Sequence, residues 1–390
     1  MSVHARQFAN PPSRTVLSPE VRLWQDAAGL TLENGERLAP LELAWRSWGS
    51  LNRAGTNAVL VIHALSGGAD LELWWPELLG TGKPLDPARD FIVCINLLGS
   101  CYGSSGPLSA HPDDGQPWQA RFPRISIRDQ VAAQSRLLRS LGVQQLRAVI
   151  GPSLGGMIAQ EFALQHPDWV QSLVLIGTTA AHSAQAIAAS ECQRAAIRLD
   201  PAFNDGFYLP GSGPVRGLAL ARELAFLTYR CDSELRARFG RHSGEHKNFA
   251  VLDYLDYQGD KFVQRFDANS YIRLTECMNS HDIGRDRGGV AAALQTLHQP
   301  TLVISLDTDQ LYPVAEQREI ARHLPNAQHV IIASRHGHDG FLTETDAVAN
   351  ALIPFLAAQP LLAATPVNGN AALRLAAGDM DNTRHSELHS

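Results

Sequence analysis

Short apolar segments alternate with helical stretches between Asn57 and Thr179, and this alternation constrains the fold more than any other feature. Apolar runs of strand length recur there, and two more follow towards the C-terminus. The six predicted strands are Ala58–Ala64, Phe91–Leu97, Leu146–Ile150, Ser172–Gly177, Thr301–Leu306 and His329–Ala333. Between two of them, Ile127–Leu141 has apolar residues at helical spacing and ends at Gly142, a typical helix stop. Strands separated by helices indicate βαβ units on a mostly parallel sheet.

The span from residue 181 to residue 297 interrupts this alternation, because it has little strand character. Helices are predicted within it at Ser183–Leu199, Pro214–Tyr229 and Ile283–Thr296, with a polar patch at Arg238–Lys247. Ligand sites in open α/β sheets lie beyond the carboxyl ends of the strands. We therefore predict that this span is a helical lid over that end of the sheet.

The predicted organisation is an α/β core in two parts with the lid between them. The core comprises residues 1–180 and 298–358, the lid comprises residues 181–297, and a loosely ordered tail occupies residues 359–390. The tail is polar and aperiodic, and such segments bury too little apolar surface to order themselves.

Charge and composition limit the classes of partner. The formal net charge is −6 and no segment is strongly basic, so we predict no nucleic-acid partner. Apolar runs such as Ala58–Leu65 are much shorter than the ~20 residues of a membrane span, and Met1–Leu17 does not resemble a secretory signal. The five cysteines form no CxxC pair, which predicts reduced thiols and no metal site. The predicted location is the cytoplasm.

A nucleophile motif follows one of the predicted strands. Gly151-Pro152-Ser153-Leu154-Gly155 fits GxSxG, and it lies between Leu146–Ile150 and a helical run at Met157–Gln165. The glycines allow a sharp turn that lifts the serine Oγ clear of its backbone. GxSxG alone is a weak signal, but the strand before it and the helix after it favour a nucleophilic serine.

An acid and a histidine follow in the order that this arrangement needs. Asp309 comes after the strand Thr301–Leu306, and His338 comes after the strand His329–Ala333. The histidine would take the proton of Ser153, and the aspartate would orient the imidazole. Asp307 and His336 are the nearby rivals, and we prefer Asp309 and His338.

Two backbone amides are candidates for an oxyanion hole. The N–H of Leu154 directly follows the serine, and the N–H of Leu65 lies in the loop after the first predicted strand. The alternative for Leu65 is a glycine-rich loop without this role.

Further motifs lie outside the nucleophile region. In the core they are Trp74-Trp75, Gly80–Lys83, Leu98–Pro107 and Phe122–Asp129, and in the predicted lid they are Gly217–Arg222, Leu227–Arg230, Tyr254–Gly259 and Ser280–Arg285. With these motifs the chain resembles the homoserine O-acetyltransferase family from about Leu41 to Leu356. Generic hydrolases have no reason to share the lid motifs.

The resemblance implies an α/β-hydrolase fold and an acyltransferase used in methionine biosynthesis. Acetyl-CoA, a co-substrate and not a cofactor, would acylate Ser153, and the acetyl group would pass to the hydroxyl of homoserine. The family's substrate arginine corresponds to Arg222, which suits a carboxylate, and its acidic partner for the substrate ammonium corresponds to Asp339. A homodimer formed through the helical span is also implied. The structural alternatives are a surface ion pair for Arg222 and a solvated carboxylate for Asp339.

The sequence departs from the family pattern beside the predicted acyl pocket. The segment Ser66–Glu72 lacks the usual histidine and carries Asp70 and Glu72, while Pro152 and Leu154 replace the residues usually found beside the serine.

The acyl donor can be argued from charge. A succinyl group would bring a carboxylate into the acyl pocket, and burying that charge without a cation is costly. Neither Leu65–Glu72 nor Gly99–Pro107 contains Lys or Arg, which favours acetyl. The choice between homoserine and serine leaves no clear residue pattern, because one methylene is worth only ~1–3 kcal/mol.

Three other functions stay open. They are a transferase of the same fold with serine as acceptor or another acyl-CoA as donor, an esterase with the same three residues, and a non-catalytic binding protein. The presence of Ser153, Asp309 and His338 together disfavours the last.

Overall fold

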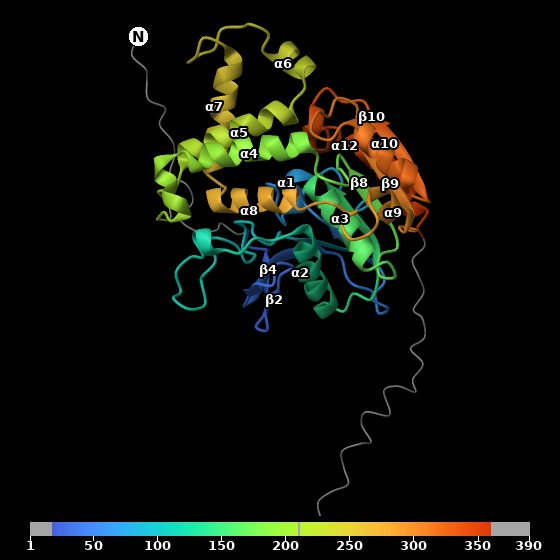
Figure 1. Cartoon of the computed structure of the whole chain (residues 1–390). Helices are drawn as coiled ribbons and strands as arrows, with labels where there is room; N and C mark the ends of the chain where they lie inside the picture. The colour runs from blue at the N-terminus through green and yellow to red at the C-terminus, as the bar shows by residue number, and fades with distance from the viewer. Residues whose placement is uncertain (1–17, 210, 360–390) are drawn as a thin grey trace, which may run out of the picture.

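An eight-stranded, mostly parallel sheet forms the centre of the computed structural model, which describes residues 18–209 and 211–359. The strand order is β1-β4-β6-β5-β7-β8-β9-β10 (Figure 1). The strands are β1 Arg22–Asp26, β4 Leu41–Trp48, β5 Ala58–Val61, β6 Phe91–Ile95, β7 Leu146–Pro152, β8 Leu173–Ile176, β9 Thr301–Leu306 and β10 Ala327–Ile332. All six predicted strands are present as β5 to β10 and pair in parallel. The α/β class is therefore confirmed.

Two strands that were not predicted extend one edge of the sheet. β4 pairs antiparallel with β6, and β1 pairs antiparallel with β4. A separate hairpin is formed by β2 Leu30–Thr31 and β3 Arg37–Leu38.

Alternate residues of the buried strands supply two cores, one on each face of the sheet. In β5, Leu60 packs in the core that includes helices α2 Ile127–Ser140 and α3 Leu154–Gln165. Its neighbours Val59 and Val61 pack in the core that includes helix α12 Thr345–Ala357. Strands buried on both faces are continuous apolar runs, which explains why β5 to β9 were recognisable.

Helices fill the chain between β8 and β9. They are α4 Ala184–Arg198, the 3-10 helix Pro201–Gly206, α5 Val215–Tyr229, α6 Asp232–Arg238, α7 Ala250–Val263, α8 Ala268–Asn279 and α9 Val290–Gln295. Figure 1 shows α4 and α5 side by side, with α6 and α7 beyond them. The helices that the lid needs are present, while its boundaries and its covering role remain a prediction.

The predicted helix Ile283–Thr296 is wrong over its first half. Only Val290–Gln295 is helical, and residues 283–289 form turns. Gly288 and Gly289 have φ of +77° and +98°, and a Cβ on Gly284 would lie 2.3 Å from the backbone N of Val290. Glycine at these positions therefore allows a tight loop, and the positive φ values are incompatible with an α-helix.

The two ends of the helical span are hydrogen-bonded to each other. The N–H of His182 donates to the carbonyl of His281 over 2.9 Å, and the N–H of Ile283 donates to the carbonyl of Ala180 over 3.0 Å. The chain therefore leaves the core and returns to it at adjacent points.

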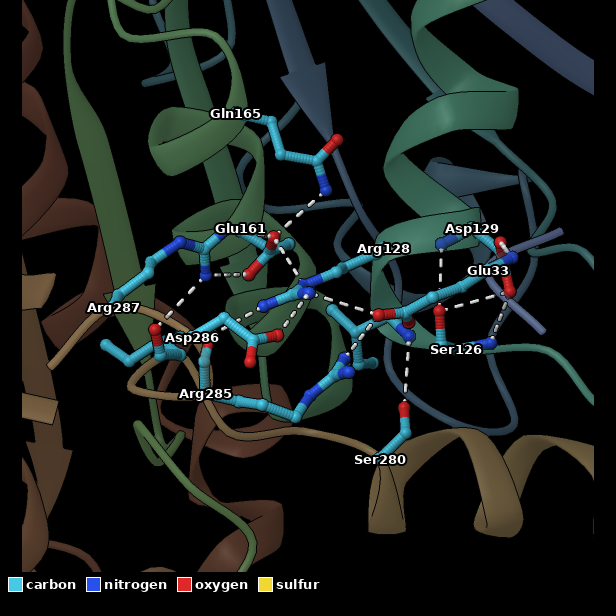
Figure 2. A network of polar contacts seen from close by, with 12 residues as sticks. Glu33, Ser126, Arg128, Asp129, Glu161, Gln165, Ser280, Arg285, Asp286 and Arg287 are labelled. Atoms are coloured by element: carbon cyan, nitrogen blue, oxygen red, sulfur yellow. Dashed lines mark hydrogen bonds and ion pairs between the residues drawn. The ribbon is translucent and has the colours of Figure 1, made fainter. Parts of the chain in front are cut away.

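A charged network fixes the returning end against the core (Figure 2). Glu161 on α3 is 2% exposed and accepts two hydrogen bonds from Arg287, over 2.6 and 2.9 Å. Arg128 at the start of α2 lies 3.4 Å from Glu161 and 3.1 Å from Glu33, and Arg285 lies 2.7 Å from Glu33. The network joins the β2–β3 hairpin, two core helices and loop 283–289.

Three remaining expectations concern the thiols, the membrane and the tail. All five cysteines are free, and four of them are buried while Cys192 is exposed. In the residues described, no helix is long and apolar enough to cross a membrane. Residues 360–390 of the predicted tail lie outside the described residues.

Candidate active site

Ser153 occupies a strained turn between β7 and α3. Its φ and ψ are +55° and −123°, a backbone conformation that residues other than glycine rarely adopt. A Cβ on Gly151 would lie 2.1 Å from the backbone of Gly155, and one on Gly155 would lie 2.0 Å from the carbonyl oxygen of Ile62. Both glycines are therefore required for the turn, as GxSxG predicts.

Ser153, His338 and Asp309 form a hydrogen-bonded chain. His338 Nε2 lies 2.9 Å from Ser153 Oγ, and His338 Nδ1 lies 2.7 Å from Asp309 Oδ2. A carboxylate only accepts, so Nδ1 carries the ring proton and Nε2 can accept the serine proton. The other oxygen of Asp309 accepts from the N–H groups of Leu311 and Tyr312. All three predicted residues are buried, and these hydrogen bonds link their side chains in series.

The environment of His338 favours its charged form. Burial lowers the pKa of His338, but the Asp309 carboxylate outweighs this effect and Asp339 adds to it, so the net pKa is raised above 6.5. The imidazolium that would form when His338 takes the serine proton is therefore stabilised.

The two rival residues have other contacts. Asp307 accepts a hydrogen bond from the N–H of Ser334, and His336 Nδ1 lies 3.5 Å from Glu234. Neither contact involves Ser153, so the geometry favours Asp309 and His338.

The pH dependence of a reaction with Ser153 as nucleophile should reflect the raised pKa of His338. Only the neutral ring accepts the serine proton, so we expect kcat/KM to fall about tenfold per pH unit below that pKa. The acid limb should therefore lie above the ordinary value of 6.5. Asp309→Asn removes the carboxylate that raises the pKa and should move the limb to lower pH. A limb at the same pH in Asp309→Asn would contradict this assignment.

The two predicted oxyanion amides come from the start of α3 and from the loop after β5. Leu154 is the first residue of α3, where N–H groups have no partner within the helix. Leu65 follows β5 and lines the same cavity as Ser153. Their role as an oxyanion hole stays a prediction.

His63 was not predicted and it fixes the loop that carries Leu65. Its Nε2 accepts from the N–H of Leu97 over 3.2 Å, so Nδ1 carries the proton and donates to the carbonyl of Ala64 over 2.8 Å. Burial lowers the pKa of His63 to about 4, although the bond to Ala64 raises it slightly. The neutral ring thus connects the loops that follow β5 and β6.

A cavity of about 190 Å³ opens beside Ser153. Its lining comes from the loop after β5, from the helical span and from the loop after β10. The residues are Ala64, Leu65, Ser66, Gly67, Trp74, Ser153, Arg222, Tyr229, Arg265, His338, Asp339, Phe341 and Leu342. Both predicted substrate residues, Arg222 and Asp339, therefore face the space that the serine faces.

Arg222 lies among aromatic rings. Its guanidinium carbon is 4.6 Å from the ring centroid of Phe226, 5.4 Å from that of Tyr229 and 4.8 Å from that of Phe262. Its contacts in the described ranges are with these rings and no carboxylate pairs with it there, so the surface ion pair is not found. A cation held by rings and left without an anion can bind a ligand carboxylate.

Asp339 is not a freely solvated carboxylate. Its Oδ2 lies 3.0 Å from Arg230 Nη2, and its side chain is 17% exposed. The sequence did not indicate this pair, because the two residues lie on elements far apart in the chain.

The charges near the predicted acyl pocket differ from those expected. Asp70 and Glu72 both pair with Arg46 on β4 and do not line the cavity. A cation is present after all, because Arg265 lines the cavity and donates to the Ser66 carbonyl and the Tyr102 hydroxyl, over 2.8 and 2.7 Å. Arg265 lies outside both Leu65–Glu72 and Gly99–Pro107, so the absence of a cation from these segments does not support acetyl.

In the part of the chain that the structure describes, no group of three or more His, Cys, Asp or Glu could hold a metal ion.

Comparisons with known proteins place this geometry in a class. Residues 57–345 match the family model of the alpha/beta hydrolase fold. The chain superimposes on the crystal structure of esterase E22 with a TM-score of 0.80 and 26% identity, covering 86% of this chain and 99% of the esterase. The chain is thus a member of the α/β-hydrolase fold.

The particular family follows from curated relatives. A homoserine O-acetyltransferase from Chloroherpeton thalassium is 46% identical over 326 residues, covering 84% of this chain and 86% of the relative. One from Nostoc punctiforme is 47% identical over 337 residues, covering 85% and 95%. The chain belongs to the homoserine O-acetyltransferase family, as its motifs indicated.

Proposed function

We propose that the chain is a homoserine O-acetyltransferase of methionine biosynthesis. The observation that carries this proposal is a single cavity with three features: the hydrogen-bonded Ser153, the cation of Arg222, which pairs with no carboxylate among the residues described, and the carboxylate of Asp339. An amino-acid acceptor carries a carboxylate and an ammonium, so it needs both charges beside the nucleophile. A simple ester needs neither.

The first half-reaction acetylates the serine. Ser153 Oγ attacks the thioester carbonyl of acetyl-CoA while His338 Nε2 takes the hydroxyl proton. The oxyanion accepts hydrogen bonds from the N–H groups of Leu65 and Leu154. The C–S bond then breaks, and His338 returns the proton to the CoA sulfur, which leaves acetyl-Ser153.

The second half-reaction uses the same groups. Arg222 binds the carboxylate of homoserine and Asp339 binds its ammonium, which directs the hydroxyl to the acetyl carbonyl. His338 takes the hydroxyl proton while the homoserine oxygen attacks the acetyl carbonyl. The bond between the acetyl carbon and Ser153 Oγ then breaks, and His338 returns the proton to Ser153 Oγ. Asp309 stabilises the imidazolium in both halves.

The test is acetyl-CoA consumption, followed as free thiol, with homoserine, serine or no acceptor. Thiol release that depends on homoserine would support the proposal. Activity only with serine, or only with succinyl-CoA as donor, would replace the substrate and keep the mechanism. The likeness to esterase E22 favours a hydrolase as the second candidate, and equal thiol release without any acceptor would establish it.

A homodimer in the cytoplasm completes the proposal. Leu220 and Leu227 on α5 are 47% and 56% exposed, and Leu252 and Tyr257 on α7 are 41% and 59% exposed. These residues could bury apolar surface against a second copy, and Leu227→Asp should then shift the protein towards the monomer in sedimentation velocity.

The cytoplasmic location is supported by the five free cysteines, which fit a reducing compartment.

A further inference from the structure

The junction between α5 and α6 lies directly across the loop that carries His338. We call residues 229–234 the junction and residues 335–339 the histidine loop. The ring of Tyr229 is 5.7 Å from the ring of His338, and Cys231 Sγ donates to the carbonyl of Arg335 over 2.9 Å. A Cβ on Gly337, whose φ is +61°, would lie 2.5 Å from the carbonyl oxygen of Tyr229. The backbones of the junction and the histidine loop are therefore in direct contact.

Charged side chains connect the same two segments. Arg230 Nη2 lies 3.0 Å from Asp339 Oδ2, and Arg230 Nη1 lies 3.1 and 3.2 Å from the two oxygens of Glu234. Glu234 in turn lies 3.5 Å from His336 Nδ1. The side chains of Arg230, Asp339 and Glu234 are 14%, 17% and 8% exposed, so solvent screens these charges only weakly. Arg230 thus binds one carboxylate on each side of the contact.

We propose that Arg230 is a positioning residue that sets the carboxylate of Asp339 for the acceptor and couples the helical span to the histidine loop. The inference rests on the proposed function, because that function gives Asp339 the acceptor ammonium. Arg230 holds Oδ2 of Asp339, and Asp339 lines the cavity beside Ser153. Arg230 does not line the cavity, so it acts through Asp339 and not on the substrate.

This role predicts an effect on one half-reaction. In Arg230→Gln the Asp339 carboxylate loses its partner, and misplacing it by about 1 Å should raise KM for homoserine ~10-fold or more. Acetylation of Ser153 by acetyl-CoA should keep its rate, because the donor presents no ammonium to Asp339. Arg230→Lys keeps the charge but not the planar fork that binds two carboxylates, so it should recover part of the loss.

The chain offers a matched control on α6. Arg236 pairs with Asp232 one turn away, and the two side chains are 77% and 75% exposed. Arg236→Gln should change neither the KM for homoserine nor the acetylation rate, because exposed pairs of this kind contribute little.

Cys231 gives a measurement that does not depend on the substrate. It follows Arg230 in the chain, is 4% exposed and contacts the histidine loop at Arg335, whereas Cys192 is the exposed cysteine. In a Cys192→Ser background, Arg230→Gln should accelerate alkylation of Cys231 by iodoacetamide, and Arg236→Gln should not.

Two results would overturn the proposal. One is an unchanged KM together with unchanged alkylation of Cys231 in Arg230→Gln. The other is an equal loss in both half-reactions with a lower unfolding midpoint, which would make Arg230 merely structural. If the wild-type protein shows no homoserine-dependent thiol release, the proposed function fails, whereas Cys231 alkylation still decides whether Arg230 holds the contact.

Discussion

Replacing Ser153 with alanine is expected to lower thiol release from acetyl-CoA by ~10⁴-fold or more, the size of loss seen when a serine nucleophile is removed. The Oγ atom that His338 contacts over 2.9 Å is the only group lost. The backbone at φ +55° is strained for alanine as it is for serine, so the fold should survive the change.

Two measurements check this expectation. The wild-type protein quenched without acceptor should carry one acetyl group on the peptide that contains Ser153, and the variant should carry none. Ser140→Ala, at an exposed position on α2, is the matched control and should behave as wild type. An acetyl group that forms in Ser153→Ala at an unchanged rate would show that the nucleophile is another residue.

Acid is expected to destabilise the fold steeply, because three buried histidines must stay neutral. Burial lowers the pKa values of His63, His182 and His281 from 6.5 to about 4. The unfolded chain binds a proton at each of them near pH 6.5, whereas the folded chain does so only near pH 4. Stability is therefore lost as the pH falls through this window, by about 1.4 kcal/mol per histidine and pH unit.

His338 does not change this slope. Its pKa is raised, so its stabilising contribution is complete below pH 6.5 and is lost as the pH rises through the folded value. Between pH 6.5 and 4 the ring is protonated in both states. Burial also lowers the pKa values of His166 and His329, so these two residues add to the loss of stability in acid in the same direction.

The free energy of urea unfolding between pH 7 and 4.5 measures this effect. We expect His63, His182 and His281 to contribute up to three protons to the slope, together about 4 kcal/mol per pH unit. His182→Gln should reduce the slope by one proton, while His298→Gln, at an exposed position, should leave it unchanged. A slope below one proton in the wild type would contradict the prediction.

The strands and site residues that could be predicted from the sequence are those marked by a local pattern of neighbouring residues. Strands β5 to β9 are continuous apolar runs because both faces of the sheet are covered. Ser153, Asp309 and His338 could each be placed from the strand before it. Their meeting follows from the parallel order, which brings the ends of β7, β9 and β10 to one edge of the sheet.

The features that were missed depend on contacts between distant segments. Arg265 reaches the cavity from the turn between α7 and α8, and Arg230 meets Asp339 across more than a hundred residues. No local pattern marks such pairs. Loop 283–289 differs from the predicted helix because Gly288 and Gly289 adopt positive φ, which the apolar spacing does not reveal. The strands β1 and β4 lie before the βαβ pattern on which the prediction rested.

The adjacent ends of the helical span make it a removable module. Ala180 and Ile283 are already hydrogen-bonded, so a short turn could join the two core parts without moving β8 or β9. Such a shortened chain would keep Ser153, Asp309 and His338 on the sheet and would lose Arg222 and Arg265 from the cavity. The core would then keep these three residues without the cations of the helical span. Another segment inserted at the same two points could select a different acceptor.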